Sequence, residues 1–132
     1  MSDVRVAAVD CGTNAVRLLV ADVTSDGHTT EIVRLMRIVR LGEGVDRTGQ
    51  FSTAALERTF TALDEYAGVL AEHQPARTRF VATSASRDAS NREIFAAGVR
   101  ARLGVDPEVI TGLEEAALSF SGAILGLPTG RA

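Results

Sequence analysis

Residues 6–20 read Val6-Ala7-Ala8-Val9-Asp10-Cys11-Gly12-Thr13-Asn14-Ala15-Val16-Arg17-Leu18-Leu19-Val20, and this stretch decides the fold. An apolar run ends at the carboxylate of Asp10, a Gly-Thr-Asn turn follows, and a second apolar run leaves the turn with Arg17 inside it. Two apolar runs separated by so short a polar turn predict two β-strands joined as a hairpin. The polar side chains then gather at the tip of that hairpin.

The tip of this predicted hairpin has the groups that a phosphate site needs. Gly12 lets a phosphate approach the main chain without a Cβ in the way, and Thr13 and Asn14 supply a hydroxyl and an amide donor. Asp10 is an oxygen ligand suited to a hydrated Mg²⁺ or another divalent cation. Gly-Thr-Asn is also good turn chemistry by itself, so the hairpin alone fits a phosphate site and an ordinary turn equally well.

The composition is that of a folded domain without a nucleic-acid or membrane signature. Of 132 residues, 45% are hydrophobic and 23% are charged, which is enough for one domain with its own core. The net charge of -3 provides no basic surface for nucleic acid, so any polyanion has to be held by a few placed cations and main-chain amides. The single cysteine agrees with a cytoplasmic location, and no apolar run approaches the ~20 residues of a membrane helix.

Strands come first along the chain, and helices and strands then alternate. The expected strands of an antiparallel meander run from Arg5 to Cys11, from Ala15 to Val23 and from Thr30 to Leu41. The later elements are a helix capped by Ser52 and closed by Pro75, a strand from Arg77 to Thr83, a helix from Asn91 to Leu103, a strand from Pro107 to Ile110, and a helix from Leu113 to Gly126 or Pro128. Strands separated by helices need crossovers and hence parallel neighbours.

This order predicts an α/β fold with a mixed five-stranded sheet and flanking helices, typical of the ribonuclease H-like (actin-like ATPase) domain. In open α/β sheets, ligands bind at the carboxyl ends of the strands. Three polar loops are expected at those ends, namely Asp10 to Asn14, Thr83 to Arg87 and Thr111 to Glu115. Three loops at one edge of a sheet favour a site more strongly than the hairpin does alone.

The sequence resembles the N-terminal domain of the exopolyphosphatase and guanosine pentaphosphate phosphatase family (Ppx/GppA). The segments that carry the resemblance are residues 10–18, 40–44, 83–91 and 108–116, and the last two are more specific than the hairpin. The chain departs from the family pattern at Ala15, where a serine is frequent, and at Cys11, where a larger aliphatic residue is common. We expect Cys11 to pack in the core.

The resemblance assigns roles to individual residues. Glu115 matches the family's catalytic glutamate, which is implied to be the general base, whereas Glu114 beside it is interpreted as a charge at a helix N-terminus. Arg87 and Arg17 are the expected cations on phosphate oxygens, because a planar guanidinium donates two parallel hydrogen bonds. Each arginine is alternatively an ordinary surface residue. Asn91 could contact ligand, but an N-cap for the helix that follows is the preferred interpretation.

Residues 1–132 are expected to be the N-terminal lobe of a two-lobed enzyme whose second, glycine-rich phosphate loop lies in a following domain that this sequence does not include. The implied reaction releases terminal orthophosphate from inorganic polyphosphate, and hydrolysis of guanosine pentaphosphate is the first alternative. A nucleotide-binding or regulatory lobe without turnover is the second, and it has no need of Glu115. The isolated lobe is expected to be inactive, and the full-length enzyme to be a cytoplasmic homodimer without nucleic-acid or membrane partners.

Overall fold

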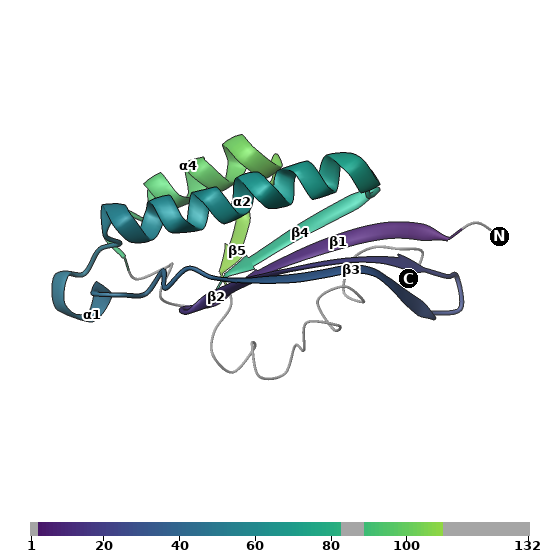
Figure 1. The fold of residues 1–132 in the computed structure, drawn as a ribbon, viewed down its shortest axis with the longest axis horizontal. Coiled ribbons are helices and arrows are strands. Elements are labelled where there is room, and N and C mark those ends of the chain that lie inside the picture. Colours follow the sequence, from purple (N-terminus) through teal and green to yellow (C-terminus); the bar gives the residue numbers. More distant parts are fainter. Residues whose placement is uncertain (1–2, 83–88, 110–132) are drawn as a thin grey trace.

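The protein is built on one mixed β-sheet. The computed structural model describes residues 3–82 and 89–109, and within them the strand order is β3-β2-β1-β4-β5 (Figure 1). The strands are β1 (Val4–Cys11), β2 (Ala15–Val23), β3 (Thr29–Ile38), β4 (Arg77–Ala82) and β5 (Pro107–Val109). β2 runs antiparallel to both of its neighbours, β1 and β3, whereas β1, β4 and β5 run parallel to one another. The predicted mixed five-stranded sheet with an antiparallel meander is confirmed.

Two helices cover one face of this sheet. Figure 1 shows α2 (Thr53–His73) and α4 (Arg92–Leu103) lying side by side above the strands, while the short α1 (Val45–Thr48) lies beyond the end of β3. The predicted N-cap of α2 is confirmed, because the Ser52 hydroxyl accepts a hydrogen bond from the Ala55 amide at 3.1 Å. Among the described residues, no helix is long and apolar enough to cross a membrane.

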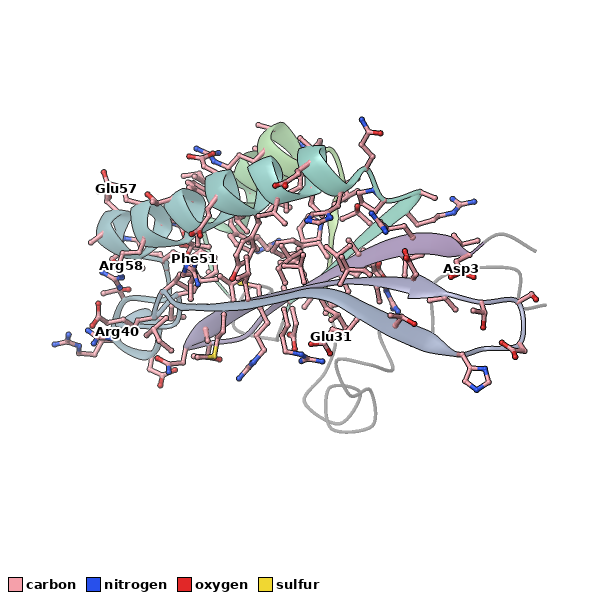
Figure 2. All side chains as sticks on the ribbon, turned by 45° about the vertical axis from the view of Figure 1, so that its right-hand side comes forward. Asp3, Glu31, Arg40, Phe51, Glu57 and Arg58 are labelled. Carbon is pink, nitrogen blue, oxygen red and sulfur yellow. The ribbon has the colours of Figure 1, made fainter. Side chains whose placement is uncertain are left out.

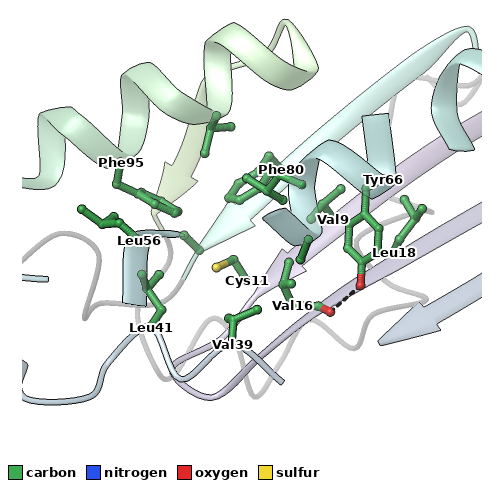
Figure 3. Close-up of a cluster of buried hydrophobic side chains, with 14 of the residues drawn as sticks. Val9, Cys11, Val16, Leu18, Val39, Leu41, Leu56, Tyr66, Phe80 and Phe95 are labelled. Carbon is green, nitrogen blue, oxygen red and sulfur yellow. Dashed lines mark hydrogen bonds between the residues drawn. The ribbon is translucent and has the colours of Figure 1, made fainter. Parts of the chain in front are cut away.

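The main core fills the space between the helices and the sheet. Its largest fully buried side chains include Tyr66, Phe80 and Phe95, which Figure 3 labels, and Phe51. The centroid of the Phe95 ring lies 5.6 Å from that of Phe51 and 5.9 Å from that of Phe80. Cys11 belongs to this cluster and is 0% exposed, so the prediction that it packs in the core is confirmed. Burial raises the pKa of its thiol to about 12, which leaves it un-ionised and unreactive.

Side chains alternate between the two faces of the sheet along β1 and β2, so every second residue lies on the face away from the helices. Val9 and Cys11 point into the main core, so Asp10 between them lies on the face away from α2 and α4. A second apolar cluster lies on that face and consists of Val6, Ala8, Leu19, Ala21 and Val23. The sheet therefore buries apolar residues on both faces, and Asp10 is placed at the end of the second cluster.

The structure corrects the predicted end of the third strand and adds one helix, and some predicted elements lie outside the described residues. The strand predicted from Thr30 to Leu41 ends at Ile38, because the carbonyl oxygen of Asn14 accepts hydrogen bonds from the amides of the next two residues and takes them out of the ladder. Val39 and Leu41 turn into the core instead. The helix α1 was not expected. Thr83, Ile110 and the helix predicted from Leu113 lie outside the described residues.

Candidate functional site

The carboxyl ends of the three parallel strands form one row. Cys11 is the register partner of Ala82, and Ala82 is the register partner of Val109. In an α/β sheet this edge is where ligands bind. Arg87 follows β4 and Glu115 follows β5 in the sequence, but both residues lie outside the described ranges, so their predicted roles stay predictions.

The hairpin tip between β1 and β2 lies beside this row. The Gly12 amide donates to the Ala15 carbonyl at 2.9 Å, which closes the tight turn. Thr13 and Asn14 are exposed, and within residues 3–82 and 89–109 their side chains have no hydrogen-bond partner. The Thr13 hydroxyl and the Asn14 amide are therefore exposed to solvent at the tip, and their predicted role in phosphate binding stays a prediction.

A segment that we call the support segment, residues 39–43, holds the tip from behind. The amides of Val39 and Arg40 donate to the Asn14 carbonyl at 2.9 and 2.8 Å, and the Gly42 amide donates to the Thr13 carbonyl at 2.9 Å. The carbonyl oxygens of Thr13 and Asn14 are thus already occupied. Because acceptors repel an anion and donors attract it, this pairing leaves the tip better suited to a phosphate.

Gly42 makes the close approach of the support segment possible. A Cβ built at this position would overlap the Cγ2 atom of Thr13. Gly44, just beyond the segment, has φ of 81°, a conformation that other residues rarely adopt. Both glycines therefore occupy positions where the backbone geometry disfavours a side chain.

Asp10 and Arg17 face each other across the β1–β2 ladder as register partners. Asp10 is half-buried, and burial raises the pKa of its carboxyl group, with the Arg17 charge acting in the opposite direction. Arg17 is exposed and forms no ion pair with the described residues. Its exposure agrees with either a phosphate contact or a plain surface arginine, the two interpretations that the sequence left open.

The chemistry of Asp10 fits a divalent cation. Partial burial makes its negative charge costly, so a nearby cation would stabilise it. Mg²⁺ is usually held by one or two carboxylates together with water and substrate phosphates, so a single carboxylate is a sufficient protein ligand. In the part of the chain that the structure describes, no three His, Cys, Asp or Glu residues gather into a fuller metal site.

Two residues have roles that the sequence reasoning did not identify. Asn91 occupies the N-cap position of α4, but its side chain makes no capping hydrogen bond, which corrects the prediction. It binds the main chain of Phe51 instead, accepting from the amide at 2.9 Å and donating to the carbonyl at 3.0 Å. Arg58 of α2 binds the support segment through Val39, Arg40 and Glu43. No spacing or composition signal marks either contact, because both join residues far apart in the sequence.

A separate groove lies between β3 and α2. It has a volume of about 500 Å³, is lined by Arg37, Ile38 and Arg58 among others, and includes none of the predicted site residues. The candidate site is therefore the exposed hairpin tip with Asp10 and Arg17, rather than this groove.

The chain is similar to known proteins over most of its length. The profile of the Ppx/GppA phosphatase family matches residues 19–132. Exopolyphosphatase 2 of Mycobacterium tuberculosis is 52% identical over 132 residues, a match to 94% of this chain and 41% of the relative. A guanosine-5'-triphosphate,3'-diphosphate pyrophosphatase of Vibrio atlanticus is 35% identical over 88% of this chain and 23% of its own. The chain thus spans less than half the length of these relatives.

Solved structures show the same fold. The crystal structure of an exopolyphosphatase-like protein superposes with a TM-score of 0.83 and 53% identity, over 90% of this chain and 36% of that one. An Aquifex aeolicus member of the Ppx/GppA family gives a TM-score of 0.79 and 37% identity, over 86% and 37% of the two chains. T. thermophilus RuvC, with a TM-score of 0.50 and 14% identity over 97% and 83%, shares the fold alone and confirms the ribonuclease H-like class.

Proposed function

Because this chain belongs to the Ppx/GppA phosphatase family, we propose that it is the N-terminal part of a hydrolase that releases terminal orthophosphate from inorganic polyphosphate. The observation that supports this best is the hairpin tip beside the row of strand ends. The carbonyl oxygens of Thr13 and Asn14 are occupied by the support segment, and the side-chain donors of these two residues are exposed. An anion fits such a surface better than a cation or an apolar ligand does.

Phosphate binding is the task of the tip in this proposal. The Thr13 hydroxyl, the Asn14 amide and the Arg17 guanidinium would donate to oxygens of the terminal phosphoryl group, while Gly12 leaves room for the ligand to approach the main chain. Arg87 would supply a second cation. With a chain net charge of -3, a few placed donors have to neutralise the substrate.

Asp10 would hold Mg²⁺ or another divalent cation. Such an ion, when bound, would reduce the negative charge on the phosphate oxygens during hydrolysis. The carboxylate itself has to be ionised to do this, and proximity to Arg17 favours that form.

Water activation is assigned to Glu115. Its carboxylate would accept a proton from a water molecule whose oxygen attacks the terminal phosphorus. The bond from that phosphorus to the bridging oxygen then breaks, and the electron pair leaves with the shortened polyphosphate. The products are orthophosphate and a chain one phosphate shorter. A lobe that only binds ligand has no use for this base.

The same residues would serve a guanosine pentaphosphate phosphatase, which is the second candidate because the Vibrio atlanticus relative is named for that chemistry. The higher identity to an exopolyphosphatase favours polyphosphate. We further propose a cytoplasmic location, which suits the one buried cysteine. A homodimer of the full-length enzyme stays a prediction.

Phosphate release by the full-length protein tests the proposal. We expect Mg²⁺-dependent release from long-chain polyphosphate, with a higher kcat/KM than for guanosine pentaphosphate. The reverse order would favour the second candidate. Binding of both compounds without release would favour a regulatory lobe and overturn the assignment of Glu115.

A further inference from the structure

Arg58 connects helix α2 to the support segment through three contacts. Its Nε donates to the Val39 carbonyl at 2.7 Å, and its Nη2 donates to the Arg40 carbonyl at 3.3 Å and to Oε1 of Glu43 at 3.0 Å. The side chain is 36% exposed, so most of it is removed from water against the segment. Figure 2 shows Arg58 on the sheet side of α2, at the end nearest Arg40.

The support segment in turn is hydrogen-bonded to the hairpin tip. The amides of Val39 and Arg40 bind the carbonyl of Asn14, and that of Gly42 binds the carbonyl of Thr13. Arg58 binds the carbonyl side of the same short segment. A continuous chain of hydrogen bonds therefore leads from α2 to the two residues that present donors to the ligand.

The backbone of the segment needs such a restraint. Arg40 has φ of 51°, in the left-handed region that is unfavourable for a residue with a Cβ. Its amide is bound by Asn14, and its carbonyl is bound by Arg58 and by the Glu43 amide at 3.1 Å. Glycines at positions 42 and 44 leave the chain beyond Arg40 with additional conformational freedom.

We propose that Arg58 is a positioning residue for phosphate binding, which it supports by fixing residues 39–43 behind the hairpin tip. The inference rests on the proposed function, since it assumes that Thr13 and Asn14 bind phosphate. Arg58 does not contact the ligand. It sets the position of the donors that do, and a donor displaced by 1 Å loses much of its contribution.

The ion pair between Arg37 and Glu65 provides a matched control. It also joins α2 to the edge of the sheet, and its partners have similar exposure, at 42% and 45%. The Arg37 guanidinium reaches the Met36 carbonyl and Glu65, but neither contact involves residues 39–43. Loss of Arg37 therefore removes a comparable ion pair and leaves the support segment intact.

Steady-state kinetics of the full-length protein with polyphosphate test the proposal, together with calorimetric titration with inorganic tripolyphosphate. For Arg58→Ala we expect KM and the Kd of tripolyphosphate to rise about tenfold, the range for hydrogen bonds to a charged group, with kcat changed less than about threefold. A purely structural role would lower the folded fraction, and so reduce the apparent kcat at unchanged KM. Arg37→Ala should leave KM unchanged.

Amide hydrogen exchange at Val39, Arg40 and Gly42 separates this inference from the proposed function. Faster exchange in Arg58→Ala with unchanged KM and Kd overturns the inference, and so does unchanged exchange. A wild-type protein that neither binds tripolyphosphate nor hydrolyses polyphosphate overturns the proposed function, whatever the exchange shows. If Arg58→Ala does not fold, Arg58→Lys replaces it. Lysine keeps the charge but lacks the planar fork, so a KM about threefold higher is expected, and an unchanged KM contradicts the inference.

Discussion

Asp10 on β1 and Arg17 on β2 occupy directly opposite positions of the hairpin ladder, on the sheet face away from α2 and α4. Burial raises the pKa of the Asp10 carboxyl group, and the Arg17 charge offsets only part of that effect. The hairpin thus holds a carboxyl group that ionises less readily in the folded protein than in the unfolded chain, beside a cation that remains exposed to solvent.

The raised pKa of Asp10 predicts a pH dependence of stability. Between the ordinary aspartate pKa of 3.8 and the raised value, the folded state binds more protons than the unfolded state. The free energy of unfolding therefore falls as pH rises through this interval. Asp10→Asn removes the titrating group and with it this contribution. Urea denaturation of both proteins at a series of pH values measures the difference, and parallel curves for the two would contradict the prediction.

Replacement of Gly42 by alanine should weaken ligand binding while the protein still folds. The new Cβ would displace the Thr13 side chain, because it overlaps Cγ2. An altered side-chain rotamer costs about 0.5–1.5 kcal/mol of stability, whereas loss of the hydroxyl as a donor to a charged phosphate should weaken tripolyphosphate binding about tenfold. Gly68→Ala in α2 is the control, since nothing lies within 4 Å of its Cβ position. That variant should gain up to about 1 kcal/mol and bind normally.

Tyr66 should ionise far above the usual range. Burial raises the pKa of its phenol to about 12, and the hydroxyl donates to the Val16 carbonyl at 2.7 Å (Figure 3). It is the single tyrosine in a sequence without tryptophan, so phenolate absorbance reports this residue alone. A midpoint near 10 in the folded protein would contradict the buried hydrogen bond. Tyr66→Phe leaves the Val16 carbonyl unpaired and should cost about 1–3 kcal/mol in thermal or urea unfolding.

The proposed roles of Glu115 and Arg87 predict different kinetic defects in the full-length enzyme. Glu115→Gln keeps the shape of the side chain but cannot accept a proton, so kcat should fall ~10²–10⁴-fold with little change in KM. Arg87→Ala removes a charge that binds the phosphoryl group in the ground and transition states alike, so kcat and KM should both worsen. Near-normal turnover by Glu115→Gln would leave Glu115 as a helix-end charge.

Much of this architecture could be predicted from local sequence. The hairpin, the β2 bounds and the Ser52 cap depend on neighbouring residues, and each is confirmed. The end of β3 could not be predicted in this way, because apolar residues continue through Val39 and Leu41. What ends the strand is the Asn14 carbonyl, a partner far away in the sequence.

Contacts between residues far apart in the sequence also explain why the sequence did not predict the roles of Asn91 and Arg58. Asn91 has the right position and chemistry for an N-cap, but the main chain of Phe51 lies close enough to satisfy both ends of its amide. Arg58 is one of several charged residues in α2, and its sequence context does not distinguish it from the others. Only the folded chain brings the carbonyls of residues 39 and 40 within its reach.

The hydrogen bonds between the support segment and the hairpin tip also limit which sequence changes the site can tolerate. All three hydrogen bonds between them join main-chain atoms, so they do not depend on the identity of the side chains at positions 13 and 14. Point substitutions there can retune ligand preference while the tip keeps its position, provided that residue 13 still clears Gly42. An insertion or deletion between Gly12 and Asn14 would move the carbonyl groups of the tip away from the amides of the support segment and break these hydrogen bonds. We therefore expect the length of this loop to be constrained more strictly than its composition.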